Sequence, residues 1–240
     1  MKMRFLSAGD RALVVEFGNA IDRALSTKVL GLAASISAAA VRGIVETVPT
    51  FRSLMVHYDP LVTTRAALEH TIARLLERAP EPRRDARLWH IPFCAEAEFA
   101  PDLDEVARLA GLSTEAVVAL HSGVRYHVYM LGFLPGFPYL GDLPAPLALP
   151  RRADPRLRVP AGSIAIATSL SAIYPYESPG GWHLIGTTPI RLFDLARPRP
   201  ALLAAGDMVR FEAIDAARFA AIRQRVERGD HSAESEPIAA

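Results

Sequence analysis

The sequence predicts two domains, a small α+β domain followed by a mainly β domain. Strand-like and helix-like segments alternate over the first 94 residues, which is typical of an α+β fold. A polar, proline-containing segment over 79–87 interrupts this part of the chain before its last strand-like run. Residues 131–200 then contain 12 of the 19 prolines, and this density of prolines excludes long helices there. We therefore place the domains at 1–84 and 85–228, with a flexible tail at 229–240.

The elements of the first domain follow from hydrophobic spacing. Apolar residues recur every three or four positions in 21–40 and 63–79, which predicts two amphipathic helices. The residues suited to cap the helix starts are Asp22 or Ser26, and Thr63 or Thr64. Runs rich in β-branched and aromatic residues predict strands within 4–18, 41–59 and 86–94. The order ββαββαβ favours a ferredoxin-like fold, although the sequence leaves open which domain owns 86–94.

The second domain is predicted to begin with two short helices and to continue as strands. Pro101 and Gly111 bound the first helix, and Ser113 and Gly123 bound the second. Short β-runs separated by turns follow, as in a β-barrel or a β-sandwich. These runs are VRYHVYML, RLRVP, SIAIAT, SAIYPY, WHLIG, PIRLFD and GDMVRFEAI.

Composition and missing motifs exclude several classes of function. Lys and Arg number 27 against 26 Asp and Glu, a balance that argues against nucleic acid as a partner. The single cysteine, Cys94, rules out an internal disulfide and indicates a cytoplasmic protein. No segment has the apolar length of a membrane helix or a signal peptide. GxxxxGK[ST], HExxH and GxSxG motifs are absent, so the sequence indicates no phosphate loop, metal site or serine-hydrolase elbow.

Candidate site residues begin in YHVYMLGFLPGFPYLGD, residues 126–142. Tyr129, Phe137 and Tyr139 are predicted to line a rigid aromatic pocket, with core filling as the alternative. His127 alternates with Tyr129 along a strand, so both side chains are expected on one face. Because a histidine changes charge near neutral pH, His127 is a candidate catalytic residue, and a structural role is the alternative.

Basic and glycine-containing segments supply further candidates. Four arginines stand at 151, 152, 156 and 158, and their guanidinium groups suit carboxylate capture, although a solvated loop is the alternative. Arg156 is our candidate among them. Gly162 and Ser163 form a turn that could offer N–H groups and a hydroxyl to a ligand, or simply a tight hairpin.

The segment SAIYPYESPGGWHLIGTTPIRLFD, residues 171–194, completes the set. Tyr174 is predicted to bind substrate, and Glu177 is a candidate general acid or base unless it is an exposed turn charge. Gly180 and Gly181 permit a close approach of the backbone to the site. Trp182 is predicted to be a packing anchor.

Three blocks, GFLPGFPYLGDL, DPRLRVPAGSIAIA and YPYESPGGWHLIGTTP, resemble signature blocks of the allophanate hydrolase subunit 1 family. The resemblance is dense over 121–194 and extends over nearly the whole chain. This family includes 5-oxoprolinase subunits, a sporulation kinase A inhibitor and a region of urea carboxylase. The chain departs from the family at Thr187, where a basic residue is usual.

The resemblance implies a fold and a function. The fold would be an α+β domain followed by a cyclophilin-like β-barrel. The function would be to open the lactam of 5-oxo-L-proline to L-glutamate at the expense of ATP, with little activity in the isolated chain. The partners would be a paralogous allophanate hydrolase subunit 2-type protein and a LamB/YcsF-type protein. The alternatives are inhibition of a sensor histidine kinase and a carboxyltransferase-like module of urea or allophanate metabolism.

Overall fold

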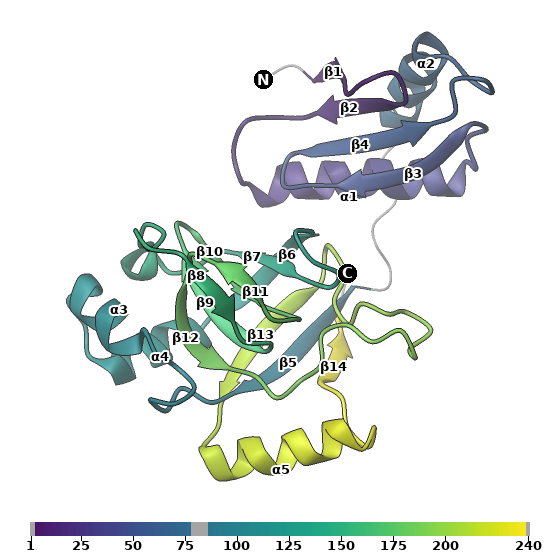
Figure 1. The fold of residues 1–240 in the computed structure, drawn as a ribbon. Helices are drawn as coiled ribbons and strands as arrows, with labels where there is room; N and C mark the ends of the chain where they lie inside the picture. Colours follow the sequence, from purple (N-terminus) through teal and green to yellow (C-terminus); the bar gives the residue numbers. More distant parts are fainter. Residues whose placement is uncertain (1–2, 78–85, 239–240) are drawn as a thin grey trace. The chain divides into compact units, whose positions relative to one another are not determined.

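The computed structural model describes residues 3–77 and 86–238, and these form two compact units, one on each side of the 85/86 boundary (Figure 1). The predicted boundary at residues 84 and 85 lies outside the described residues. Each unit is a mixture of helices and strands. No helix in the described ranges has the length and apolar character needed to cross a membrane.

The N-terminal unit is a four-stranded antiparallel sheet with two helices. Its elements are β1 (Arg4–Ser7), β2 (Ala12–Glu16), α1 (Arg23–Ala38), β3 (Ile44–Pro49), β4 (Ser53–Tyr58) and α2 (Arg65–Leu76). The strand order is β1-β2-β4-β3. Asp22 and Thr64 accept hydrogen bonds from the N–H groups of Leu25 and Ala67 and so cap the two helices, as the sequence predicts. Apolar residues of β2, β4, α1 and α2 form one buried core.

The second unit contains an eight-stranded sheet, a two-stranded sheet and three α-helices. Its first elements are β5 (Arg87–Phe93), α3 (Leu103–Ala110), α4 (Thr114–Ser122), β6 (Arg125–Leu131), β7 (Pro138–Gly141) and the short 3-10 helix η1 (Ala145–Leu147). The remainder are β8 (Arg156–Val159), β9 (Ser163–Ala167), β10 (Leu170–Ile173), β11 (Ser178–Gly180), β12 (His183–Thr187), β13 (Met208–Ala213), α5 (Ala216–Glu227) and β14 (Glu234–Pro237). The large sheet has the order β12-β9-β10-β7-β6-β13-β5-β14, and β11 pairs with β8.

A bridge between Cys94 and Thr187 joins two distant strands of the large sheet. Each residue donates its N–H group to the carbonyl of the other, at 2.9 Å in both directions. Cys94 directly follows β5, and Thr187 ends β12. The bridge therefore links the end of β5 to β12, the first strand in the order of the large sheet. The Thr187 hydroxyl also donates to the Phe99 carbonyl at 2.8 Å. Thr187 therefore has a structural role at this bridge.

Strand 86–94, which the sequence leaves open between the two domains, lies in the second unit, because β5 pairs with β13 and β14. Other expectations for this unit need correction. The tail at 229–240 is not wholly flexible, because Arg87 donates to Ser235 and fixes β14 at the sheet edge. Helix α5 is not among the predicted elements. Residues 189–194 are predicted to form a strand and contain only a single bridge, from Phe193 to Ala201.

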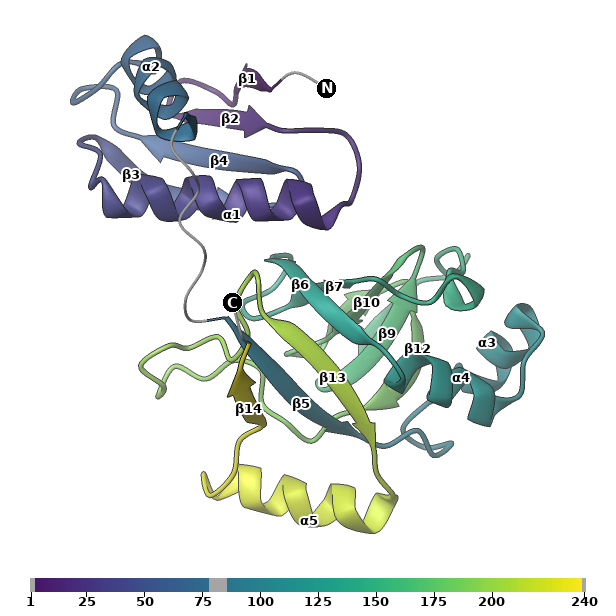
Figure 2. The same cartoon turned by 180° about the vertical axis from the view of Figure 1, so that it is seen from behind.

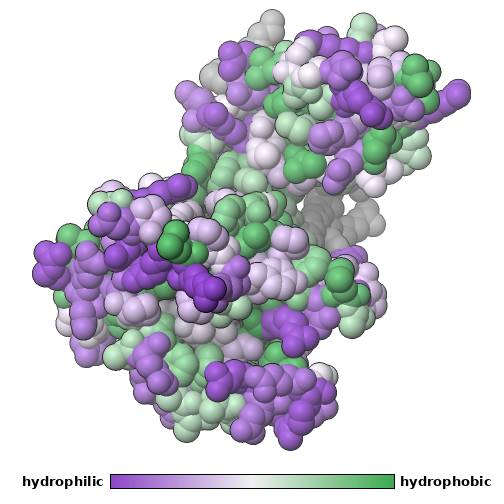
Figure 3. All heavy atoms as spheres, viewed as in Figure 1, coloured by the Kyte–Doolittle hydropathy of each residue, from purple (hydrophilic) through white to green (hydrophobic). Residues whose placement is uncertain are grey.

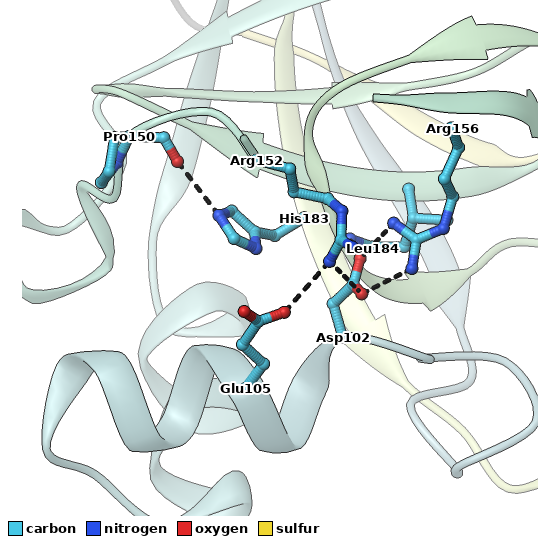
Figure 4. Close-up of polar contacts among 7 residues, drawn as sticks. All are labelled: Asp102, Glu105, Pro150, Arg152, Arg156, His183 and Leu184. Carbon is cyan, nitrogen blue, oxygen red and sulfur yellow. Dashed lines mark hydrogen bonds and ion pairs between the residues drawn. The ribbon is translucent and has the colours of Figure 1, made fainter. Parts of the chain in front are cut away.

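A buried carboxylate ties together the start of α3, strand β12 and the chain around β8 (Figure 4). Asp102 is 3% exposed and accepts two hydrogen bonds from the Arg156 guanidinium, at 2.8 and 2.6 Å, and one from Arg152 at 2.9 Å. The Leu184 N–H group donates to the same carboxylate at 2.7 Å, and the Asp102 N–H group donates to the Leu184 carbonyl at 3.0 Å. Arg152 also reaches Glu105 at 3.0 Å. We call Asp102, Arg152, Arg156 and Leu184 the Asp102 cluster.

The surroundings of Asp102 favour its charged form. Burial raises the pKa of this carboxyl, but the hydrogen bonds from Arg156 and Leu184 and the charges of Arg156 and Arg152 lower it further than burial raises it. The net result is a pKa below the usual value for an aspartate. The carboxylate is therefore ionised at neutral pH and holds both arginines.

We expect Asp102→Asn to lower the free energy of unfolding by about 3 kcal/mol. Removing one partner of a buried ion pair typically costs about 3–5 kcal/mol, and the two arginines keep about a quarter of their side chains exposed, which reduces the cost. Urea unfolding measures the change. Asp154→Asn, an exposed site in the same loop as the arginines, is the control and should change stability by less than about 0.5 kcal/mol. Equal effects of the two substitutions would contradict the assignment.

The contribution of Asp102 to stability should also depend on pH. Its pKa is lower in the folded chain than in the unfolded chain, so its contribution is fully present above the unfolded value of about 4 and is lost as pH falls through the folded value. The difference in unfolding free energy between wild type and Asp102→Asn should therefore shrink between about pH 5 and pH 3. A difference that stays constant over this range would show that the carboxylate charge does not stabilise the fold.

Candidate functional site

Four aromatic side chains of the second unit gather at one place. Phe137 precedes β7, Tyr139 lies in β7, Tyr174 follows β10, and Trp182 precedes β12. The Phe137 ring centroid lies 5.1 Å from Tyr139, 5.1 Å from Tyr174 and 6.4 Å from Trp182. Tyr139 and Trp182 lie 6.2 Å apart. The structure thus brings together three predicted substrate-binding residues and the predicted packing anchor, which we call the aromatic cluster.

Phe133 lies at the solvent side of the aromatic cluster. Its ring centroid is 5.4 Å from Phe137, yet its side chain is 61% exposed. Its φ of 70° is unusual for a bulky residue, because Cβ crowds the backbone in the left-handed region. A strained backbone that exposes an aromatic ring is typical of functional surfaces rather than of core filling.

Arg151 lies over the aromatic cluster, and sequence reasoning missed it. Its guanidinium carbon is 6.0 Å from the Trp182 ring centroid, within the range of a cation–π contact. Its positive charge also lowers the pKa of Tyr139 and of Tyr174, against the rise that burial causes. Within residues 3–77 and 86–238, Arg151 has no acidic partner. The guanidinium is therefore free to bind an anion beside the aromatic rings.

The backbone on both sides of Arg151 is anchored (Figure 4). The Pro150 carbonyl accepts a hydrogen bond from Nε2 of the buried His183 at 3.0 Å. The Arg152 N–H group donates to the Gly181 carbonyl at 2.8 Å, and the Arg152 side chain is held by Asp102. These contacts on either side of Arg151 fix where its side chain leaves the backbone.

The two tyrosines of the cluster keep their protons at neutral pH. Burial raises the pKa of Tyr174 to about 12, and the Arg151 charge offsets only part of this rise. Burial likewise raises the pKa of Tyr139, again partly opposed by Arg151. Protonated hydroxyl groups are hydrogen-bond donors, so they can polarise a carbonyl but cannot act as general bases.

Glycines predicted to approach a ligand are instead packed against the protein. A side chain at Gly180 would collide with the Tyr174 hydroxyl, and one at Gly162 would collide with the Thr188 carbonyl. The Gly162 N–H group donates to the Tyr174 carbonyl at 2.7 Å, and the Ser163 N–H group to the Pro160 carbonyl at 3.3 Å. The expectation that this turn offers free N–H groups is therefore wrong, because both groups have protein partners.

Gly181 and the Ser163 side chain also face the protein. A side chain at Gly181 would pack against Pro155, and the Gly181 carbonyl accepts a hydrogen bond from Arg152. Ser163 is 2% exposed, which places its hydroxyl in the interior. These residues shape the walls around Tyr174, and any direct contact with substrate stays a prediction.

Two charged candidates have positions that differ from the expectation. The Arg156 guanidinium is occupied by Asp102, so Arg156 is not the free cation that the arginine-rich segment predicts. The Glu177 side chain is 57% exposed and lies 3.5 Å from Arg158. This position matches the alternative considered for Glu177, which is an exposed charge in a turn. A catalytic role for Glu177 stays a prediction.

His127 and Tyr129 lie together on β6, as their alternation predicts. Their ring centroids are 4.6 Å apart and nearly perpendicular. Tyr129 is 2% exposed and packs on Gly141 of the neighbouring strand β7, which leaves no room for a side chain there. His127 is half-buried beside it. The catalytic role of His127 also stays a prediction.

Comparisons with known proteins identify the family. The model described as "Carboxyltransferase domain, subdomain C and D" matches residues 3–203. The chain is 39% identical to the B subunit of 5-oxoprolinase from Bacillus subtilis (strain 168) over 230 residues, 90% of this chain and 95% of that protein. It is 41% identical to the B subunit of 5-oxoprolinase from Escherichia coli O157:H7 over 204 residues, 85% and 92% of the two chains.

Solved structures share the fold. A conserved uncharacterized protein from Pyrococcus horikoshii matches with a TM-score of 0.55 at 40% identity, over 90% of this chain and 100% of that chain. A longer chain matches with a TM-score of 0.77 at 40% identity, and the present chain covers 40% of it. The K. lactis urea amidolyase, at 21% identity and a TM-score of 0.78, shares the fold over 16% of its length. The similarity to the B subunits of 5-oxoprolinases confirms the resemblance seen in the sequence. The chain therefore belongs to the carboxyltransferase subdomain C and D family.

Proposed function

We propose that this protein is a subunit of an ATP-dependent 5-oxoprolinase, which opens 5-oxo-L-proline to L-glutamate. The observation that carries the proposal is the 39% identity to the B subunit of a 5-oxoprolinase across 90% of this chain and 95% of that protein. We propose two partner subunits, an allophanate hydrolase subunit 2-type protein and a LamB/YcsF-type protein, and a cytoplasmic location. Because each relative is named as one subunit of an enzyme, the relatives support a multi-subunit complex.

The aromatic cluster and Arg151 fit 5-oxo-L-proline. This substrate carries a carboxylate, which a guanidinium group binds through two parallel hydrogen bonds. Its flat lactam ring suits an aromatic surface, and a protonated tyrosine hydroxyl can donate to the lactam carbonyl. In the reaction, water adds to the carbonyl carbon, the C–N bond breaks, and the ring nitrogen takes up a proton. We assign carboxylate binding to Arg151 and donation to the carbonyl to Tyr139, because Tyr174 is only 2% exposed.

We propose that ATP is consumed by the assembled complex and activates an amide carbonyl that water attacks poorly. The residues of the aromatic cluster fit a carboxylate better than a triphosphate. The sequence lacks a GxxxxGK[ST] loop, and among the described residues one guanidinium without an acidic partner, that of Arg151, lies beside the aromatic cluster. In the same ranges, no three His, Cys, Asp or Glu side chains are grouped to hold a metal ion.

We also propose the finer architecture that the family resemblance implies. The second unit would be a cyclophilin-like barrel, and the bridge from Cys94 to Thr187 supports a closed arrangement of its large sheet. The first unit would be ferredoxin-like in the broad sense of two helices on an antiparallel sheet. Cyclophilin-like shape would not imply prolyl isomerase activity, because function depends on the site.

The carboxyltransferase alternative has weaker support. The chain is 25% identical to the urea amidolyase of Lachancea kluyveri and corresponds to 13% of that protein. A module of that size would act only as part of a larger enzyme.

Arg151→Gln should raise the KM for 5-oxo-L-proline by about 10- to 100-fold in the reconstituted complex, with a smaller change in kcat. The range follows from losing a charge-assisted hydrogen bond worth about 1.5–3 kcal/mol. Glutamate release from 5-oxoproline is the assay. Arg158→Gln removes an arginine that is 83% exposed and should leave KM unchanged. An unchanged KM for Arg151→Gln would remove Arg151 from the site.

The purified chain alone should release little or no glutamate. Co-expression with the two proposed partner subunits should restore release, and omitting ATP should abolish it. Full ATP-dependent activity of the isolated chain would contradict its assignment as one part of a complex. Absence of activity in the complete, folded complex would contradict the proposed reaction itself.

A further inference from the structure

A cavity lies in the second unit, between α5 and the strands β5, β13 and β14. Its volume is about 280 Å³. Its titratable lining residues are His90, Glu212, Arg218, Arg225, His231 and Glu234. Figure 2 shows β13, β5 and β14 with α5 at their lower end. None of these residues belongs to the aromatic cluster.

The cavity exists because α5 covers a polar face of the sheet. Val209 and Phe211 of β13 turn into the core, whereas the intervening Arg210 and the following Glu212 are exposed. A helix normally packs an apolar stripe on a sheet, but α5 buries only Phe219 and Ile222 among its residues. Its C-terminal half carries hydrophilic side chains, seen at the lower right of the molecule in Figure 3.

Three charged groups of the cavity have no ion-pair partner among the described residues, whereas a fourth, Glu212, contacts His90. Arg218 and Arg225 are seven residues apart, so they share one face of α5 with about 10 Å between their backbone positions. In the described part of the chain, neither guanidinium forms an ion pair, and the same holds for the Glu234 carboxylate. His90 lies between two glutamates, with Nδ1 2.7 Å from Glu212 and Nε2 3.8 Å from Glu236.

We propose that this cavity binds an acidic amino acid. The two guanidinium groups suit two carboxylates, which they bind through paired hydrogen bonds. Glu234, which has no ion pair in the described ranges, suits the ammonium group of the same ligand. Glu212 contacts His90 and adds a second negative charge to the cavity. A phosphate or a simple dicarboxylate would meet these like charges and has no ammonium group to pair with Glu234. The mixture of both signs therefore selects a zwitterion with an additional negative charge.

The proposed reaction releases L-glutamate, which belongs to this class. The inference that the cavity binds the product of the enzyme's own reaction rests on the proposed function. The cavity's preference for an acidic amino acid does not, because it follows from the charged residues that line the cavity.

Isothermal titration calorimetry on the full chain, without ATP or partner subunits, tests the proposal with L-glutamate as the probe. We expect saturable binding that Arg218→Gln and Arg225→Gln each weaken by about tenfold or more, the loss of one charge-assisted contact. Glutarate, which lacks the ammonium group, should bind at least about fivefold more weakly. Arg223→Gln is the matched control, because Arg223 lies on the same helix over the Phe219 ring and does not line the cavity.

Three results would overturn the proposal. The first is no saturable binding of L-glutamate to a chain with a cooperative thermal transition. The second is equal weakening by Arg223→Gln and Arg225→Gln. The third is loss of binding in Arg151→Gln but not in Arg225→Gln, which would move the ligand to the aromatic cluster. Because no turnover is measured, binding that persists while the complex fails to open 5-oxoproline would refute only the proposed function.

Discussion

The buried carboxylate of Asp102 is the constraint on which the candidate site depends. It has four hydrogen-bond donors, three from Arg152 and Arg156 and one from the Leu184 backbone. Burying a charge is costly unless it is paired and fully hydrogen-bonded, and here the pairing is complete enough to lower the pKa of the carboxyl. One side chain thereby joins the start of α3 to β12 and to the loop that leads into β8.

This arrangement separates arginines that support the fold from one that faces solvent. Arg152 and Arg156 are paired with Asp102, whereas Arg151 is exposed beside Trp182. Because the backbone is anchored at Pro150 and Arg152, the exposed side chain departs from a fixed position. A preorganised cation of this kind loses little entropy when it binds a carboxylate. Arg218 and Arg225 of α5 show no such division into paired and exposed arginines in the described part of the chain. Both lack an ion pair, and both lie on a helix that covers a polar face of the sheet.

Local signals predict much of the fold, and long-range contacts account for part of what they miss. Helix caps and stops depend on contacts between residues only a few positions apart, so the sequence indicates them. This holds for the caps at Asp22, Thr64 and Ser113 and for the stop at Gly111. Helix α5 is absent from the prediction although Phe219, Ile222 and Val226 recur at helical spacing and Asp215 caps its start, so the local signal is present in the sequence. Among the four arginines, the choice of Arg156 over Arg151 is wrong for a free cation, because its partner Asp102 is 54 residues away in the chain.

We infer that the Asp102 cluster serves the site by placing Arg151. A double-mutant cycle on kcat/KM for 5-oxo-L-proline, with Arg151→Gln, Arg152→Gln and the double variant in the reconstituted complex, tests this dependence. If Arg152 acts through the position of Arg151, the double variant should lose no more than Arg151→Gln alone. Losses that simply add would show that Arg152 and Arg151 act independently and would contradict the placing of Arg151 by the Asp102 cluster.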